Sequence, residues 1–338
     1  MSTPVPTILS GITSSGQPTL GNFIGAYLPF ARFLKQKTHR VYMMVADHHA
    51  ITVRQDPKAF HDNTLAGVAW YVASGLNPDL CTLFIQSHVT EHTQLGWILN
   101  TYTQMGELNR MTQFKDKSKG ENDGVGVGLY TYPCLMAADI ALYDATEVPV
   151  GDDQTQHVEF TRDVVTRFNN LYGPTMVLPK AVKPVAGARV MDLQEPDRKM
   201  SKSRPGAGTV LLQDTPAEIE KKIKRAVTDT LGVVNYSPAD QPGLANLIEI
   251  LAACRGATPQ AIAHEYAGGQ YGPLKNAVAE AVVETLRPVQ ADYAKLMADK
   301  GELNRLLVAG AEKARAHAAQ TLRRVMEKVG YVLPAHGV

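Results

Sequence analysis

The chain has 338 residues, enough for two domains of ordinary size, and its 44% hydrophobic and 20% charged residues match the usage of globular proteins. A formal net charge of +1 excludes a protein that coats itself in nucleic acid, so any contact with RNA must use a local basic patch. Three scattered cysteines, no signal-peptide pattern and no run of roughly 20 apolar residues predict a cytoplasmic protein without disulfides, a cysteine zinc site or a membrane partner.

The first half of the chain alternates short apolar runs with helical patterns. Thr7 to Ser10 predicts a buried strand that ends in a Gly/Ser/Thr turn, and Asn22 to Gln36 has helical apolar spacing, with a bend expected at Pro29. A second helix begins after Asp56, which caps it, and ends at Gly75. Further strands are expected at Val41 to Val45, Thr82 to Ile85 and Val148 to Val150. This alternation predicts an α/β fold with a parallel sheet covered on both faces, whose ligands bind beyond the carboxyl ends of the strands.

From about residue 206 the pattern becomes helical. Thr215 to Glu218 has the form of a capping box, Thr258 opens another helix, and a third runs from Leu274 with a bend expected at Pro288. The boundary between the halves is expected at Lys202 to Gly208, where proline and glycine cluster.

Two segments have the composition of phosphate-binding loops. Lys199 and Lys202 lie three residues apart in Lys-Met-Ser-Lys-Ser, where two ammonium groups can converge on a polyphosphate, although a solvated basic loop has the same composition. The second segment, residues 10–22, is a turn of small residues after the first strand that leads into a helix N-terminus, which favours an anion. Either segment alone is weak evidence.

Together the two segments resemble the paired signatures of class I aminoacyl-tRNA synthetases, with Thr19-Leu20-Gly21-Asn22 in the form typical of the tryptophan and tyrosine branch. Residues 132–140, Tyr-Pro-Cys-Leu-Met-Ala-Ala-Asp-Ile, resemble the tryptophan-binding helix of that family. The carboxylate of Asp139 can accept the indole N–H, and Met136 would be an apolar wall for the ring. Without the resemblance, Asp139 would be either a pairing partner in the core or a site residue.

The resemblance, which runs from about Leu9 to the C-terminus, implies a set of site residues. The expected tryptophan contacts are Tyr132, Met136, Asp139, Gln154 and His49, the last of which is otherwise a structural histidine. The expected ATP contacts are Thr13, Ser14, Ser15, Gly21, Asn22, Lys117, Gly151, Asp152, Asp153, Val190, Lys199, Met200, Ser201, Lys202 and Ser203. The expected catalytic residues are Thr19, Asn22, Lys199 and Lys202. Thr13 to Ser15 replace the family's usual Gln-Pro-Ser, and Thr13 does not reach as far toward ATP as glutamine. Asp152 replaces the usual Glu, which implies a slightly different contact with the ribose.

The resemblance also implies a Rossmann-like, doubly wound catalytic domain at residues 1–205 and an all-helical anticodon-binding domain at 206–299. A last helix at about 300–338 would pack back on the first domain, and the protein would be a homodimer. It would activate L-tryptophan with ATP, carried with Mg²⁺ but without a metal site of the protein, and would load tRNA(Trp) but not bind DNA. The alternatives are a tyrosine enzyme of the same fold, a paralogue that does not charge tRNA, and a nucleotidyltransferase of the same superfamily.

Three other patterns in the sequence could be taken for functional motifs. His88 to His92 fits a zinc-binding His-x-x-Glu-His pattern, but nothing supplies an obvious third ligand. The glycines at 124–128 follow no strand, so they are not a dinucleotide fingerprint. The basic residues at 221–225 are either a solvated helix face or a contact for the tRNA backbone.

Overall fold

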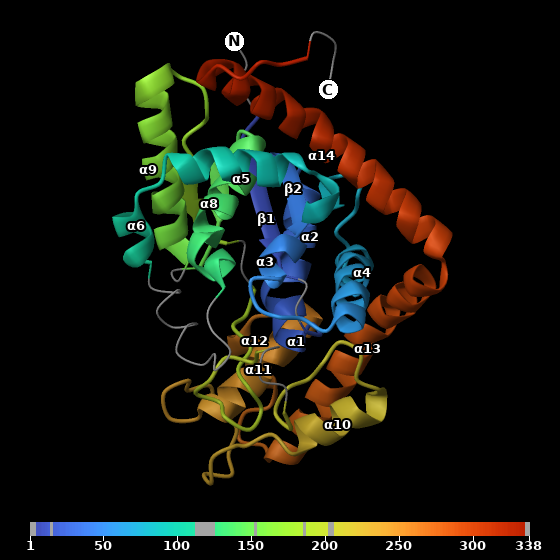
Figure 1. Ribbon diagram of the computed structural model, residues 1–338. Helices are drawn as coiled ribbons and strands as arrows, with labels where there is room; N and C mark the ends of the chain where they lie inside the picture. The colour runs from blue at the N-terminus through green and yellow to red at the C-terminus, as the bar shows by residue number, and fades with distance from the viewer. Residues whose placement is uncertain are drawn as a thin grey trace.

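A five-stranded parallel sheet forms the centre of the first half of the molecule (Figure 1). The computed structural model describes residues 5–13, 16–111, 126–151, 154–184, 187–201 and 206–334. The strands are β1 (Thr7–Ile12), β2 (Arg40–Val45), β3 (Thr82–Ile85), β4 (Glu147–Pro149) and β5 (Lys180–Val182). Their order in the sheet is β3-β2-β1-β4-β5. The four strands expected from the sequence are confirmed, and β5 is an addition.

Helices cover both faces of this sheet. Those in the described residues of the first half are α1 (Leu20–Asn22), the π-helix η1 (Phe23–Tyr27), α2 (Leu28–Leu34), α3 (Asp47–Ala50), α4 (Pro57–Ala73), the 3-10 helix η2 (Gln86–His88), α5 (Glu91–Thr101), α6 (Met105–Asn109), α8 (Val127–Leu142) and α9 (Thr155–Tyr172). Neighbouring residues of β2 point to opposite faces: Met43 packs in a core with α1, α2 and α4, and Met44 in a second core with α5, α8 and α9. The doubly wound α/β fold is therefore confirmed.

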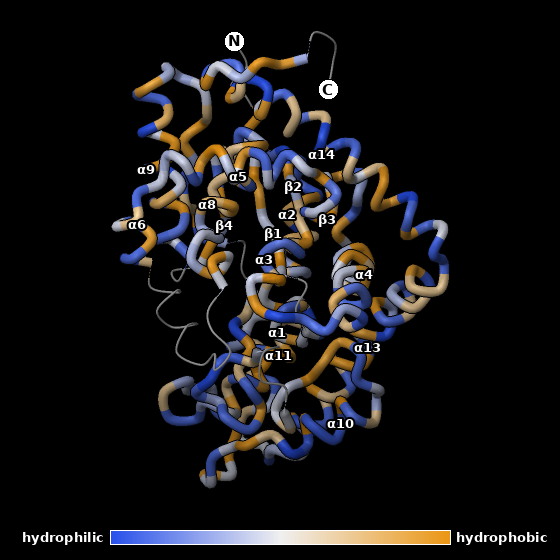
Figure 2. Tube along the Cα trace, in the orientation of Figure 1, coloured by the Kyte–Doolittle hydropathy of each residue, from blue (hydrophilic) through white to orange (hydrophobic). Residues whose placement is uncertain are grey.

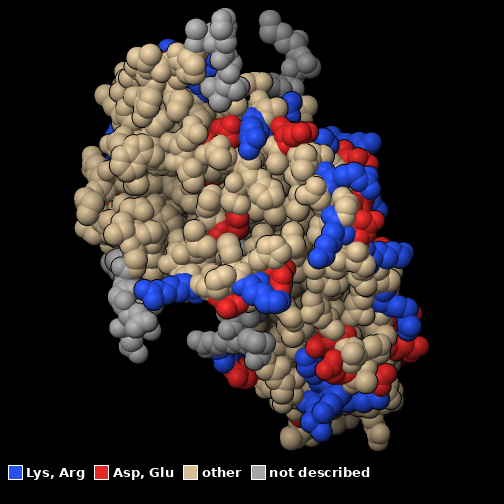
Figure 3. All heavy atoms as spheres, turned by 45° about the vertical axis from the view of Figure 1, so that its right-hand side comes forward, with Lys and Arg blue, Asp and Glu red and all other residues tan. Residues whose placement is uncertain are grey.

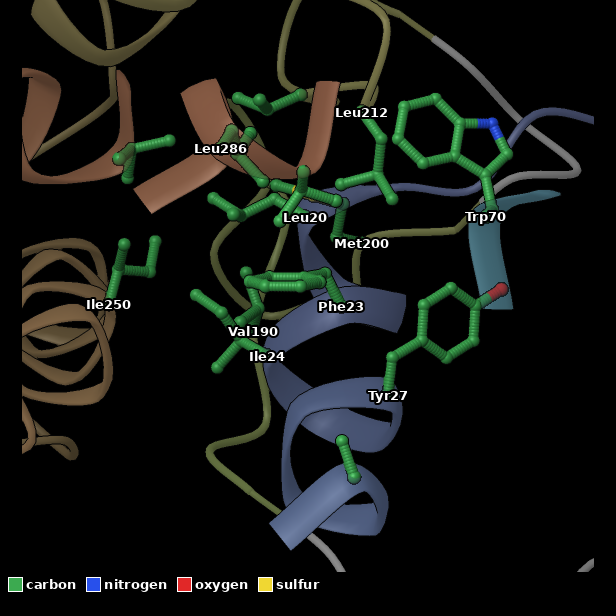
Figure 4. Packing of buried hydrophobic residues seen from close by; sticks show 14 of the residues in the cluster. Leu20, Phe23, Ile24, Tyr27, Trp70, Val190, Met200, Leu212, Ile250 and Leu286 are labelled. Carbon is green, nitrogen blue, oxygen red and sulfur yellow. The ribbon is translucent and has the colours of Figure 1, made fainter. Parts of the chain in front are cut away.

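The second half of the described chain is helical, as expected. Its helices are α10 (Pro216–Lys224), α11 (Pro242–Arg255), α12 (Pro259–Glu265), α13 (Tyr271–Ala298) and α14 (Lys300–Val329). The expected capping box at Thr215 and Glu218 is present, and Thr258 caps α12 through the N–H of Ala261. Helix α13 continues through Pro288. Buried residues of α11 and α13, such as Ile250 and Leu286, share one core with Leu20 of α1 (Figure 4).

Helix α14 crosses back over the first half and packs against β3, α5 and α8 (Figure 1). Hydrophilic and hydrophobic residues alternate along it, as expected for a helix with one face on the protein (Figure 2). At Gly310 the helix backbone approaches β3 so closely that a Cβ there would overlap the carbonyl oxygen of Leu83. Within the part of the chain that the structure describes, no helix has both the length and the apolar character needed to cross a membrane.

The helix after β1 is less regular than its sequence suggests. It begins in α form, becomes a π-helix at Phe23–Tyr27, and returns to α form at Leu28. Pro29 lacks an N–H, so the carbonyl of Gly25 receives no helical hydrogen bond from that position. Instead it accepts one of 3.1 Å from the backbone N–H of Gly187. The irregular turn thereby fixes the segment from Gly187 to Val190 against the helix.

Candidate active site

Some of the expected ligand contacts that the structure describes lie at the carboxyl ends of the strands. The chain passes from β1 to β2 and β3 on one side and then returns to β4 on the other side of β1, so the connection reverses between β1 and β4. Such switch points are where open α/β sheets bind ligands. Thr13 follows β1 and Gly151 follows β4, and both are exposed there. The α1 N-terminus lies beyond the same end of β1.

Thr19 and Asn22 bind each other at the start of α1. The Thr19 N–H donates to Oδ1 of Asn22 over 2.9 Å, and the Asn22 N–H donates to Oγ1 of Thr19 over 3.3 Å. Thr19 is fully buried, so its hydroxyl caps the helix instead of facing solvent. Asn22 is partly exposed, and in the described part of the chain no protein acceptor takes its Nδ2 group. The pair presents one amide donor at a helix N-terminus.

Residues 190–192 and 198–200 form a small antiparallel hairpin. It carries the first part of the lysine loop, which is the Lys-Met-Ser-Lys-Ser segment at residues 199–203. Met191 and Lys199 are opposite each other, the N–H of Met200 donates to the carbonyl of Val190 over 3.1 Å, and that of Asp192 to Arg198. The Met200 side chain is buried near Leu20 and Phe23, as Figure 4 shows. Gly21 lets it approach, since a Cβ on Gly21 would lie 3.4 Å from that of Met200. The two signature segments are thus in direct contact, while Lys199 itself is exposed.

Asp139 on α8 is the centre of a buried hydrogen-bond network. Nε2 of His49 donates to Oδ2 of Asp139 over 2.7 Å, and Oδ1 accepts from Nε2 of Gln86 (2.8 Å) and Nδ1 of His92 (2.6 Å). Nε2 of His92 is in turn hydrogen-bonded to the Tyr143 hydroxyl at 2.7 Å. Burial by itself raises the pKa of the Asp139 carboxyl, but the hydrogen bonds and charges of His49 and His92 outweigh it and hold that pKa well below the ordinary value. Asp139 is therefore an ionised core group with three donors.

Tyr132 lies two turns before Asp139 on α8 and is buried beside the same network. Its ring meets that of His49 edge-on, with centroids 6.0 Å apart, and its hydroxyl is hydrogen-bonded to Nε2 of His157 at 2.7 Å. Gln154 precedes α9 one turn before His157, and Met136 is half-buried between Tyr132 and Asp139 on α8. The structure thus brings Tyr132, His49 and Asp139 together.

Several expected contacts lie outside the described residues. They are Ser14, Ser15, Lys117, Asp152, Asp153, Lys202 and Ser203. Most of them directly follow a described part of the site: Thr13, Gly151 and Ser201 are the described neighbours in the sequence. Their roles therefore stay predictions.

The network contains partners that the sequence did not reveal. Gln86 follows β3 as His49 follows β2. Because ligands bind beyond the carboxyl ends of parallel strands, its position after a strand could have indicated Gln86 as a site residue. His92 appeared only as one end of the His-x-x-Glu-His pattern, but its two ring nitrogens bind Asp139 and Tyr143, and His88 is exposed. In the described ranges no group of three His, Cys, Asp or Glu side chains could hold a metal ion.

Comparison with known proteins agrees with the two signature segments. The family model of the class I tRNA synthetases (W and Y) matches residues 1–287. The chain belongs to this family. A tryptophan–tRNA ligase of Clostridium perfringens is 50% identical to this class I synthetase over 326 residues, which cover 96% of this chain and 97% of the relative. A tryptophan–tRNA ligase of Leifsonia xyli is 47% identical over 335 residues, covering 98% and 99%.

Solved structures give the same relationship for this synthetase. A tryptophanyl-tRNA synthetase from Campylobacter jejuni, in complex with ADP and tryptophan, superposes with a TM-score of 0.84 at 31% identity and covers 96% of this chain and 100% of its own. A tryptophanyl-tRNA synthetase from Mycoplasma pneumoniae gives 0.83 at 33% identity, covering 97% and 98%. A tyrosyl-tRNA synthetase from Archaeoglobus fulgidus, at 18% identity and a TM-score of 0.66, shares the fold alone.

Proposed function

We propose that the protein is a tryptophan–tRNA ligase. The carboxylate of L-tryptophan attacks the α-phosphorus of ATP, the bond to the β-phosphate breaks, and tryptophanyl-adenylate and pyrophosphate form. The tryptophanyl group then passes to a hydroxyl of the 3′-terminal adenosine of tRNA(Trp), and AMP leaves. The observation that carries the proposal is the ionised Asp139 carboxylate, the one charged residue of α8, buried beside Tyr132.

On the amino-acid side, we assign the indole N–H to Asp139. A carboxylate has about four lone-pair positions, and three are taken by His49, Gln86 and His92, so one remains for a further donor. Indole is a donor only and would find there a charged acceptor that the three neighbours fix in place. Met136 would contact the ring, and Tyr132 and Gln154 the amino end of the substrate.

On the nucleotide side, we assign the phosphates to the α1 N-terminus and the lysine loop. Asn22 offers its Nδ2 group at a helix end, where the backbone dipoles favour an anion. Because Thr19 is fully buried, its proposed role is to hold Asn22 and the helix start. Lys199, Lys202 and the Mg²⁺ that ATP carries would balance the charge on the departing pyrophosphate. Thr13, Gly21, Gly151 and the backbone at Val190 are the proposed contacts for the rest of ATP.

The decisive experiment is ATP–pyrophosphate exchange with each amino acid in turn. Exchange that depends on tryptophan supports the proposal, and exchange with tyrosine would instead identify the tyrosine enzyme. Exchange without charging of tRNA would identify a paralogue that does not charge tRNA. A transfer of AMP to a small acid other than an amino acid would indicate a nucleotidyltransferase.

We propose that tRNA binds to the helical half. We also propose the division into domains that the sequence suggests, at 1–205, 206–299 and 300–338. Helix α10 supports this, because Lys221, Lys224 and Arg225 are exposed at its C-terminal end. We further propose that the protein acts in the cytoplasm, where tRNA is charged for protein synthesis.

We also propose that the protein is a homodimer joined at α5 and the chain before α4. Trp97 of α5 is 67% exposed and Ile51 is 56% exposed, and both border a hollow of about 390 Å³. The described residues that line this hollow include no Lys, Arg, Asp or Glu. Charged side chains are unevenly distributed over the molecule as a whole, and a broad area on the left of Figure 3 has almost none. Exposed aromatic side chains in uncharged surroundings are typical of interface centres. In sedimentation equilibrium the protein should be a dimer and Trp97→Asp a monomer, and identical masses would refute this interface.

A further inference from the structure

One side chain of α11 fixes the hairpin that carries Lys199 through two hydrogen bonds. In this hairpin the hydrogen bonds between the two strands run from Met200 to Val190 and from Asp192 to Arg198. Met191, between them, therefore points its own N–H and carbonyl away from the partner strand. Both groups are taken by one residue of the helical half: the N–H of Met191 donates to Oδ1 of Asn246 over 2.9 Å, and Nδ2 of Asn246 donates to the carbonyl of Met191 over 3.1 Å.

Asn246 is well suited to this contact. It lies on α11 and is 3% exposed, so its amide is isolated from water. A carboxamide has a donor and an acceptor on the same planar group, and it can pair with a backbone N–H and C=O as a neighbouring strand would. A buried amide without partners is costly, and no other hydrogen bond occupies Asn246 in the described chain.

The segment at residues 206–210, which follows the lysine loop, is tied both to the hairpin and to the start of α1. Oδ2 of Asp192 accepts from the Thr209 hydroxyl over 3.1 Å, and the N–H of Leu20 donates to the carbonyl of Val210 over 2.8 Å. The loop thus leaves from a hairpin fixed to α11 and returns to a segment fixed to α1. The distance from Lys199 to the phosphates proposed at Asn22 depends on both attachments.

We propose that Asn246 is a positioning residue for the activation reaction: it fixes the Met191 strand to α11 and so sets the place of Lys199 and of the Val190 backbone relative to the α1 N-terminus. The inference rests on the proposed function, because it assigns Asn246 to the nucleotide side of that reaction. It touches neither substrate nor reacting atoms. Losing it should affect the rate of adenylate formation and leave tryptophan binding unchanged.

The test compares Asn246→Ala with Asn169→Ala. Asn169 on α9 also clamps a backbone segment, through hydrogen bonds to Thr175 and Met176, and neither of these residues belongs to the proposed nucleotide site. In tryptophan-dependent pyrophosphate exchange, Asn246→Ala should lower kcat about 10- to 100-fold, as expected for a misplaced group. Its KM for tryptophan should stay within about 2-fold of the wild type, since uniform binding is unaffected. Asn169→Ala should lower the unfolding temperature without this loss of kcat.

A second variant separates positioning from general loss of stability. In Asn246→Asp a carboxylate still accepts from the Met191 N–H but repels the Met191 carbonyl, and only the protonated acid can donate to it. Burial raises the pKa of such a carboxyl. The activity of Asn246→Asp relative to wild type should therefore rise as the pH falls from about 8 to about 6, whereas the ratio for Asn246→Ala stays flat.

The outcomes distinguish a failure of the positioning role of Asn246 from a failure of the proposed function. If the wild type shows no tryptophan-dependent exchange, the proposed function fails. If the wild type is active and Asn246→Ala has the same kcat as Asn169→Ala, the positioning role is wrong. A flat ratio for Asn246→Asp across this pH range would also overturn it.

Discussion

Nδ1 of His92 lies 2.6 Å from Oδ1 of Asp139, and both side chains are sealed from solvent. His92→Ala should lower the free energy of unfolding by about 3–5 kcal/mol, because a buried charge loses a partner and a cavity remains. His88→Ala, on the exposed histidine of the same pattern, should change it by less than about 0.5 kcal/mol. Urea denaturation measures both. Equal losses would contradict the network and revive a joint role for the two histidines.

Asp139→Ala should weaken tryptophan binding by about 1.5–3 kcal/mol, the range for a hydrogen bond to a charged group. Asp139→Asn keeps the volume of the side chain and should weaken tryptophan binding by a similar amount. The amide has one acceptor oxygen, whereas the ionised carboxylate has two. Titration calorimetry at a temperature where both variants are folded gives the affinities. An affinity equal to that of the wild type would rule out Asp139 as the indole acceptor.

Lys202→Ala should slow adenylate formation by about 10²–10³-fold, as does the loss of one preorganised donor to developing charge. The affinity for tryptophan should stay nearly constant, because the lysine loop belongs to the nucleotide side. Lys202→Arg should not fully restore the rate, since the planar guanidinium of arginine differs from the compact ammonium group of lysine. Single-turnover kinetics with both substrates saturating measure the step, with Lys300→Ala on α14 as an exposed control. A wild-type rate in Lys202→Ala would remove the loop from the mechanism.

The basic residues of α10 should divide into two groups. Lys222 is paired with Asp214 at 2.6 Å and is partly buried, so Lys222→Ala should mainly reduce stability. Lys221 and Arg225 are exposed without such an ion pair among the described residues, and replacing both by Ala should reduce the salt slope of tRNA binding by about 1 for each phosphate that the variant no longer binds. Filter binding across salt concentrations gives the slope. An unchanged slope would return these residues to a solvated helix face.

The three cysteines should be unreactive in the native protein at pH 8. Burial raises the pKa of the Cys81 thiol to about 12, and it also raises the pKa of Cys134 and Cys254. The protonated thiol is a poor nucleophile, so reaction should accelerate only as the pH rises toward about 12. A thiol reagent in native buffer and in denaturant provides the comparison. Rapid labelling of Cys81 at pH 8 would show that the strand edge around it opens.

The strands and helix ends that were predicted correctly from the sequence are those set by local chemistry. β3 has its expected bounds of Thr82–Ile85 because an apolar run is bounded by polar turns, and Asp56 caps α4 through the N–H of Ala59. β5 was missed, since three residues without apolar alternation acquire strand form only from pairing with β4. The π-helix at Phe23–Tyr27 was also missed: Pro29 signalled an irregularity, but its form depends on Gly187, distant in sequence.

The candidate site divides in the same way. The resemblance to the synthetase family indicated Asp139 and His49 as site residues. The donor character of the indole N–H explained why a carboxylate would bind it. The partners His92 and Gln86 lie 47 and 53 residues from Asp139, and only the fold brings them within hydrogen-bond distance. Likewise, nothing in the sequence around Asn246 indicates that its amide binds Met191, because that contact depends on how α11 packs.

The contact of Gly310 with Leu83 has a consequence for how the chain is made. β3 is an edge strand of the sheet, and the α14 backbone lies against it. Edge strands offer unpaired backbone groups to any other extended chain, which is a route to aggregation. Because α14 spans Lys300–Val329, this cover is synthesised long after β3. The nascent protein therefore has an open sheet edge for most of its translation, and shortening the chain before residue 300 would leave that edge open permanently.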